Sequence, residues 1–187
     1  MSAFLFSLVA VFLTSLGSRD QVLIARLSGV LGRNYALLVL GCLIAAGTAA
    51  LMTAAGAHIG AMLPGPAKTM LAAFALIMAS AELAWPNRVR KPVEPTRSLG
   101  AIGIVLLARQ FGDASRFLIF AFAAGAGLSW FAGAGGAIGG IAAVALGWVL
   151  RGDLEAVLPL RTIRTVLAIV VGIAAAVIAL SARGLIW

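Results

Sequence analysis

Six apolar stretches, each long enough to cross a bilayer as a helix, constrain this chain more than any other feature of its sequence. A membrane-spanning helix takes roughly 20 predominantly apolar residues. The stretches lie at about 3–31, 35–62, 67–85, 99–126, 129–150 and 163–184. Hydrophobic residues make up 63% of the 187 positions and charged residues only 11%, so a soluble globule could not bury its apolar surface. The sequence therefore predicts an all-α integral membrane protein with six transmembrane helices.

The residue types that most enzymes and metal centres need are scarce. His58 is the single histidine and Cys42 the single cysteine, which excludes an internal disulfide and a multi-histidine metal site. The chain has no P-loop and no nucleophile–base pair, so we expect no enzyme and no resident cofactor. The net charge of +8 does not indicate a nucleic-acid partner, because the basic residues lie in short connectors and at helix ends.

The distribution of basic residues predicts the orientation. With six spans, the connectors near 32–34, 86–98 and 151–162 share one side of the membrane. That side carries eight Lys or Arg residues, whereas the side with both termini carries only Lys68 and Arg183. Basic loops stay in the cytoplasm, so we expect a bacterial-type inner-membrane protein with both termini outside the cytoplasm. No basic n-region precedes the first stretch, which favours a retained helix over a cleaved signal peptide.

Aromatic residues near the predicted span ends fit an interfacial belt that anchors a membrane protein. They are Tyr35, Trp85, Trp130, Trp148 and Trp187. Glu82, near the end of the third stretch, fits either an interfacial carboxylate or a proton-coupling group at the cytoplasmic vestibule.

A shift of 95 residues aligns the chain with itself without a gap. The coinciding positions include Gly17 with Gly112, Tyr35 with Trp130, and Leu63-Pro64 with Leu158-Pro159. Each half holds three spans, and an odd number inserts the second half upside down relative to the first. We therefore predict two inverted three-helix repeats, at 1–85 and 99–187, joined by a basic cytoplasmic linker at 86–98. Such repeats are the architecture of many secondary transporters, whose site lies near the midplane where the repeats meet.

Each half carries one polar segment inside apolar sequence, and the shift superposes the two. The first segment is residues 14–21, TSLGSRDQ, and the second is residues 109–116, RQFGDASR. A charge at the centre of a bilayer costs about 2.5–3.5 kcal/mol on insertion scales, so such groups face protein or water and mark a functional path. The glycine in each segment permits a local break in the helix, which would free carbonyl groups as cation ligands.

These segments resemble the motif Glu-x-Gly-Asp-[Lys/Arg]-[Ser/Thr] of the small six-helix Mn²⁺/Ca²⁺–proton exchanger family, the bacterial relatives of the Golgi transmembrane Ca²⁺/Mn²⁺ transporter. In the second half, Gln110 stands at the glutamate position, Gly112, Asp113 and Ser115 match, and Ala114 replaces the basic residue. In the first half, Gly17 and Arg19 match the motif. Ser15 stands at the glutamate position, Ser18 at the aspartate position and Asp20 at the hydroxyl position. Gln21 follows the motif. The resemblance covers essentially the whole chain.

The resemblance implies a divalent cation–proton antiporter whose cation site lies between the repeats. Asp113 and Asp20 would be the anionic metal ligands, and Asp113 would also accept the proton. The full set of candidate cation-binding residues is Asp113, Ser115, Gln110, Asp20, Ser18, Ser15 and Gln21. The expected partners are the lipid bilayer, with a small inorganic ion (Mn²⁺ or Ca²⁺) and protons as substrates.

The arginines beside these residues leave two other functions open. Arg19, Arg109 and Arg116 outnumber the two aspartates, and that field repels a divalent cation. Asp113 could form ion pairs with Arg109 and Arg116 on its own helix face. Alternatively, ion pairs could form between the two repeats, Asp113 with Arg19 and Asp20 with Arg116. Ion pairs of either kind would indicate a degenerate, non-transporting family member. The arginines would also suit a transporter of an anionic or polar solute.

The fifth apolar stretch is rich in glycine, with the spacings Gly135 to Gly139 and Gly136 to Gly140. Small residues four apart let helices pack closely in lipid. The expected contact lies within the chain or at a homodimer interface, and the former is favoured.

Overall fold

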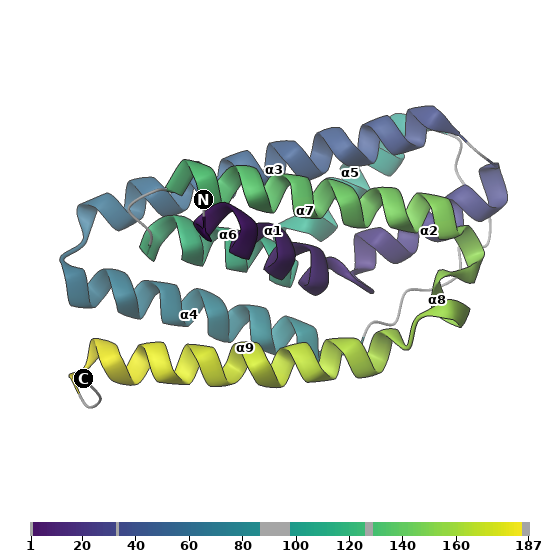
Figure 1. Ribbon diagram of the computed structural model, residues 1–187. Helices are drawn as coiled ribbons and strands as arrows, with labels where there is room; N and C mark the ends of the chain where they lie inside the picture. The colour runs from purple at the N-terminus through teal and green to yellow at the C-terminus, as the bar shows by residue number, and fades with distance from the viewer. Residues whose placement is uncertain (1, 33, 87–97, 126–128, 185–187) are drawn as a thin grey trace.

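The computed structural model describes residues 2–32, 34–86, 98–125 and 129–184, and the regular structure in these ranges is helical (Figure 1). The elements are α1 (Ser2–Ser15), α2 (Arg19–Leu31), α3 (Tyr35–Met62), α4 (Gly65–Ala84), α5 (Leu99–Phe111), α6 (Ala114–Gly125), α7 (Ser129–Leu150), the 3₁₀ turn η1 (Arg151–Asp153), α8 (Leu154–Val157) and α9 (Leu160–Ala182). The linker predicted at 86–98 lies outside the described residues except for its two ends, and so does Trp187.

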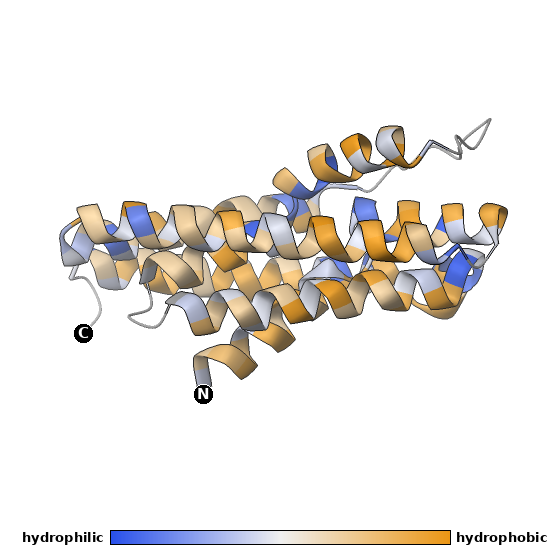
Figure 2. Ribbon diagram, turned by 90° about the horizontal axis from the view of Figure 1, so that it is seen from above, coloured by the Kyte–Doolittle hydropathy of each residue, from blue (hydrophilic) through white to orange (hydrophobic). Residues whose placement is uncertain are grey.

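Four helices are long and apolar enough to cross a membrane: α3, α4, the run Trp130–Val157, and α9. The bent pair of α1 and α2 would make a fifth span, whereas α5 and α6 are shorter apolar helices. The long helices run side by side (Figure 1), and apolar residues make up much of their length (Figure 2). Large apolar side chains such as Leu43, Phe74 and Ile173 are exposed there. Several apolar helices could therefore span a membrane, which suggests a membrane protein.

The first and fourth apolar stretches are each broken near the middle. α1 and α2 meet at an angle of 63°. Gly17, between them, has a φ of +71°, which glycine adopts at little cost and other residues rarely do. The next residue, Ser18, caps α2 by accepting a hydrogen bond from Gln21 N at 3.3 Å. In the fourth stretch, Gly112 and Asp113 separate α5 from α6. Both breaks fall in the polar segments that the sequence analysis aligned.

Glycines of α7 let its backbone touch that of α1. A Cβ at Gly135 would lie 2.2 Å from Phe4 O, and one at Gly139 would lie 2.4 Å from Leu8 O. The expected small-residue contact therefore lies within the chain, between these two helices.

Trp148 differs from the other aromatic residues of the predicted interfacial belt. Its side chain is only 8% exposed, its Nε1 donates to Asn34 O at 3.0 Å, and its ring lies 5.3 Å from that of Tyr35. Tyr35, Trp85 and Trp130 remain exposed, as the belt requires. Trp148 thus joins α7 to the start of α3 rather than facing lipid alone.

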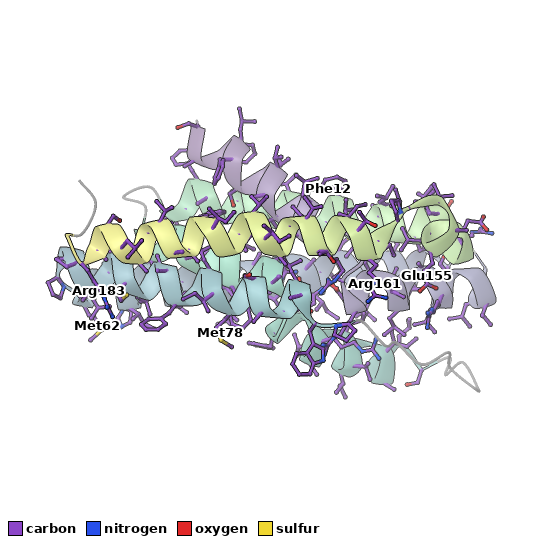
Figure 3. All side chains as sticks on the ribbon, turned by 90° about the horizontal axis from the view of Figure 1, so that it is seen from below. Phe12, Met62, Met78, Glu155, Arg161 and Arg183 are labelled. Carbon is purple, nitrogen blue, oxygen red and sulfur yellow. The ribbon has the colours of Figure 1, made fainter. Side chains whose placement is uncertain are left out.

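The two ends of the bundle carry different polar groups. Figure 3 shows Arg183 and Met62 at one end and Arg161 and Glu155 toward the other. The polar residues of the two helix breaks lie between these ends, in the interior of the bundle.

Candidate functional site

The two helix breaks lie against each other, joined by the side chain of Gln110. This residue lies in the last turn of α5, three residues before Asp113, and has no exposed surface. Its Nε2 donates to Asp20 Oδ2 at 2.8 Å, which connects α5 to the start of α2. Its Oε1 accepts from Thr48 Oγ1 at 2.7 Å and from Arg116 Nη2 at 3.0 Å. A single buried amide therefore bonds to groups on α2, α3 and α6.

Asp20 is held on both of its carboxylate oxygens. Ser18 Oγ donates to Oδ1, and Gln110 Nε2 donates to Oδ2. Asp20 is also the second residue of α2, where the positive end of the helix dipole stabilises a negative charge. Both oxygens of this carboxylate therefore already accept a hydrogen bond from the protein itself.

Gln21 and Ser15 stabilise the first break. Gln21 Oε1 accepts from Gly17 N at 2.7 Å, and its Nε2 donates to Ala143 O on α7 at 2.8 Å. Ser15 is the last residue of α1, is buried, and accepts a bond from Ser18 N at its carbonyl oxygen. Both candidates thus lie at the break, where their described hydrogen bonds are structural.

Asp113 is the acidic residue of the two polar segments that lines a cavity. Its side chain is 4% exposed, and its Oδ2 accepts hydrogen bonds from Ser115 N, at 3.2 Å, and from Ser115 Oγ. This is the capping arrangement that begins α6. The carboxylate also lines a cavity of about 400 Å³ beside α5. The cavity is lined by Arg19, Glu82, Ile104, Val105, Ala108, Arg109, Gly112 and Asp113.

The arginines of the two segments are arranged differently from the expected pairs. In the described ranges the ion pairs are Arg26–Glu155 and Arg164–Glu82, and neither includes Asp20 or Asp113. Arg116 reaches Asp20 only through the Gln110 amide.

Arg109 and Arg116 occupy distinct surroundings. Arg109 Nη1 donates to Arg19 O at 3.0 Å, which ties α5 to the start of α2, and Arg109 lines the cavity of Asp113. Arg116 is 2% exposed, and within the described part of the chain its Nε and Nη1 are buried without a hydrogen-bond partner. Its guanidinium lies against Gly140, where a Cβ would be 3.3 Å from Nη1. Gly140 therefore leaves the room that this buried charge occupies.

Two residues of the cavity region, Glu82 and Arg164, were not among the predicted site residues. Arg164 Nη2 donates to both carboxylate oxygens of Glu82, at 3.1 and 3.0 Å, and their side chains are only 5% and 11% exposed. In sequence, Glu82 fits either an interfacial carboxylate or a proton-coupling group, and Arg164 fits a basic residue near a helix end. Their separation of 82 residues hides the pair, and the one available signal was Glu82, a carboxylate that stands among mostly apolar residues near the end of the third stretch.

The described residues contain no group of three His, Cys, Asp or Glu side chains close enough to hold a metal ion. A divalent cation beside Asp113 would take most of its ligands from hydroxyl, amide and carbonyl oxygens or from water. Ca²⁺ and Mn²⁺ both accept such oxygen ligands.

No protein-family model, curated protein or solved structure matches this chain.

Proposed function

We propose that this protein is a secondary transporter with six membrane crossings, built as two inverted repeats, that exchanges a small divalent cation, Mn²⁺ or Ca²⁺, for protons. The observation that carries the proposal is Asp113, a buried carboxylate at a helix break that lines a cavity of about 400 Å³ in a bundle of largely apolar helices. An ionisable group in such a place is costly and by default marks the path of an ion or proton.

The helix bounds support the repeat. Adding 95 to the bounds of α1, α2, α3 and α4 produces 97–110, 114–126, 130–157 and 160–179. The corresponding observed helices are α5 at 99–111, α6 at 114–125, α7 to α8 at 129–157, and α9 at 160–182. The bonds from Gln110 to Asp20 and from Arg109 to Arg19 O then join the broken helix of one repeat to that of the other.

The exchange follows from the chemistry of one carboxylate. When Asp113 is protonated it is neutral and needs no counter-ion in the apolar surroundings. When a cation enters the cavity, the carboxylate releases its proton and becomes an anionic ligand, with Ser115 holding one of its oxygens in place. Each ion bound thus displaces a proton from this group, which couples the two movements in opposite directions.

Replacing Asp113 by asparagine should abolish proton-driven uptake of Mn²⁺ and Ca²⁺ into proteoliposomes, because the amide neither binds nor releases a proton at ordinary pH. Uptake is measured with an entrapped metal-sensitive dye after an outward proton gradient is imposed. Asp153→Asn removes a carboxylate from the η1 turn at the surface and should leave uptake unchanged. Wild-type vesicles that take up no more ion than the Asp113→Asn vesicles would rule out cation exchange.

The predicted orientation has its own test in the cysteine-free Cys42→Ala background. A cysteine at Pro95 should react with a membrane-impermeant thiol reagent only from the cytoplasmic side, and a cysteine at Gly65 only from the opposite side, because the basic connectors remain in the cytoplasm. The measurement compares labelling in intact cells and in inverted vesicles. Labelling of the Pro95 position from outside would reverse the topology.

Transport of an anionic or polar solute is a second candidate, supported by Arg19 and Arg109 in the wall of the same cavity. The same proteoliposomes loaded with sulfate or chloride distinguish it, since anion efflux would then persist without Mn²⁺ or Ca²⁺. A non-transporting member of the resembled family would show neither flux.

A further inference from the structure

The buried Arg164–Glu82 pair stands between two cavities. Glu82 lines the cavity of about 400 Å³ that holds Asp113. Arg164 lines a second cavity of about 750 Å³, formed by the start of α2, the end of α4 and the start of α9. Its lining includes Gly17, Glu155 and Arg161 as well as Arg164. The facing walls of the two cavities are thus joined by one ion pair.

Arg164 binds three different groups at this partition. Its Nη2 donates to the Glu82 carboxylate and to Glu82 O at 2.9 Å, and its Nη1 donates to Gly17 O at 3.4 Å. Gly17 belongs to the break between α1 and α2, and its positive φ directs the backbone there toward Arg164. A Cβ at Gly17 would come within 3.3 Å of the Arg164 side chain. The arginine therefore connects the end of α4 to the broken helix of the first half.

We propose that Glu82 is a second ion-binding carboxylate of the transport path, and that the cation passes between the two cavities by replacing the Arg164 guanidinium on it. This inference rests on the proposed function. Arg164 is then a positioning residue: its guanidinium neutralises the Glu82 carboxylate while no ion is bound there and the path is closed.

The cavity sets two carboxylates, Glu82 and Asp113, against Arg19 and Arg109 in the same wall, so a divalent cation needs both acids in order to bind there. Glu82 is the carboxylate that shares the cavity with Asp113, so the two acids together can offer a divalent cation the two negative charges that Asp113 alone lacks. Without an ion, an unpaired carboxylate would be costly in this buried place, and Arg164 removes that cost. A guanidinium and a divalent cation compete for the same oxygens, so occupancy by one excludes the other.

The test compares charge-neutral double variants. Glu82→Gln with Arg164→Gln removes both charges together and leaves no buried charge unpaired, so this variant should fold and melt near the wild-type temperature. Its half-saturating Mn²⁺ concentration for uptake into proteoliposomes should rise by about tenfold, the change that ~1.4 kcal/mol of lost binding produces. The matched control, Arg151→Gln with Asp153→Asn, removes one positive and one negative charge from the η1 turn, none of whose residues lines either cavity, and should not change this concentration.

A single variant tests the competition directly. Arg164→Gln keeps the Glu82 carboxylate and removes its competitor, so its half-saturating Mn²⁺ concentration should fall below that of the wild type. A folded Glu82→Gln/Arg164→Gln variant with wild-type half-saturation would overturn the inference while Asp113-dependent uptake, and with it the proposed function, remained. Wild-type protein without uptake would overturn both.

Discussion

Replacing Gly135 and Gly139 together by alanine should lower the free energy of unfolding by about 2–5 kcal/mol, because each added methyl group meets backbone rather than a movable side chain. The Cβ positions lie 2.2 Å from Phe4 O and 2.4 Å from Leu8 O, so α1 must move away from α7 as a unit. Helices in lipid are held by close packing more than by the hydrophobic effect, so this separation removes most of the attraction between them. Thermal unfolding in detergent, followed by circular dichroism, measures the loss.

Gly47→Ala is the matched control for this double variant. Gly47 lies in α3 with nothing within 4 Å of its Cβ position. The same change should there raise the free energy of unfolding by up to about 1 kcal/mol, because alanine loses less backbone entropy in a helix. A Gly135→Ala/Gly139→Ala protein as stable as the wild type would show that α1 does not rest on α7 in this way.

The positions of the helix breaks were accessible from the sequence, because local chemistry determines them. Ser18 and Asp113 each lie one residue after a glycine, and their side chains accept hydrogen bonds from backbone N–H groups two or three residues on. Such side chains compete with the helix and begin a new one. The alignment of two polar segments, each with its glycine, therefore predicted where the broken helices would be, although it did not predict the bend of 63°.

The partners of the charged residues were not accessible, because they depend on how distant helices pack. The sequence allows Arg116 to pair with Asp113 or Asp20, whereas in the structure it donates to the Gln110 amide. The sequence shows Arg164 only as a basic residue near the start of a helix, whereas in the structure it is buried against Glu82. A hydropathy pattern places a residue along a helix but does not tell which neighbour its side chain reaches, and that neighbour decides its role.

Replacing Gln110 by glutamate should turn the centre of the molecule into a cation site. The Gln110 Nε2 group now donates to Asp20 Oδ2 at 2.8 Å, and in the variant two carboxylate oxygens would face each other at this position. Two carboxylates so close cannot both ionise unless a proton or a cation lies between them. Glutamate is also the residue that the motif of the resembled family has at this position.

In the absence of divalent ions, the Gln110→Glu protein should be less stable than the wild type by about 1–3 kcal/mol, the cost of a lost buried hydrogen bond. Arg116 limits this loss, since its guanidinium would gain a carboxylate in place of an amide oxygen. Addition of Ca²⁺ or Mn²⁺ should reverse it, because an ion at about 100 times its dissociation constant stabilises the folded state by about 2.7 kcal/mol. Melting temperatures with EDTA and with Ca²⁺ measure both effects.

The stabilisation by Ca²⁺ should depend on the added negative charge and not on the loss of the Gln110 hydrogen bonds. An uncharged variant at the same position distinguishes these two effects. Gln110→Leu removes the same hydrogen bonds without adding a carboxylate, so its melting temperature should fall and should not respond to Ca²⁺. If Gln110→Glu responded to Ca²⁺ no more than Gln110→Leu does, then Asp20 and position 110 would not form a shared ion site. A strong response would instead indicate that this one amide, which bonds to both Asp20 and Arg116, keeps cations from binding at the centre, whereas Asp113 and Glu82 line the cavity beside it.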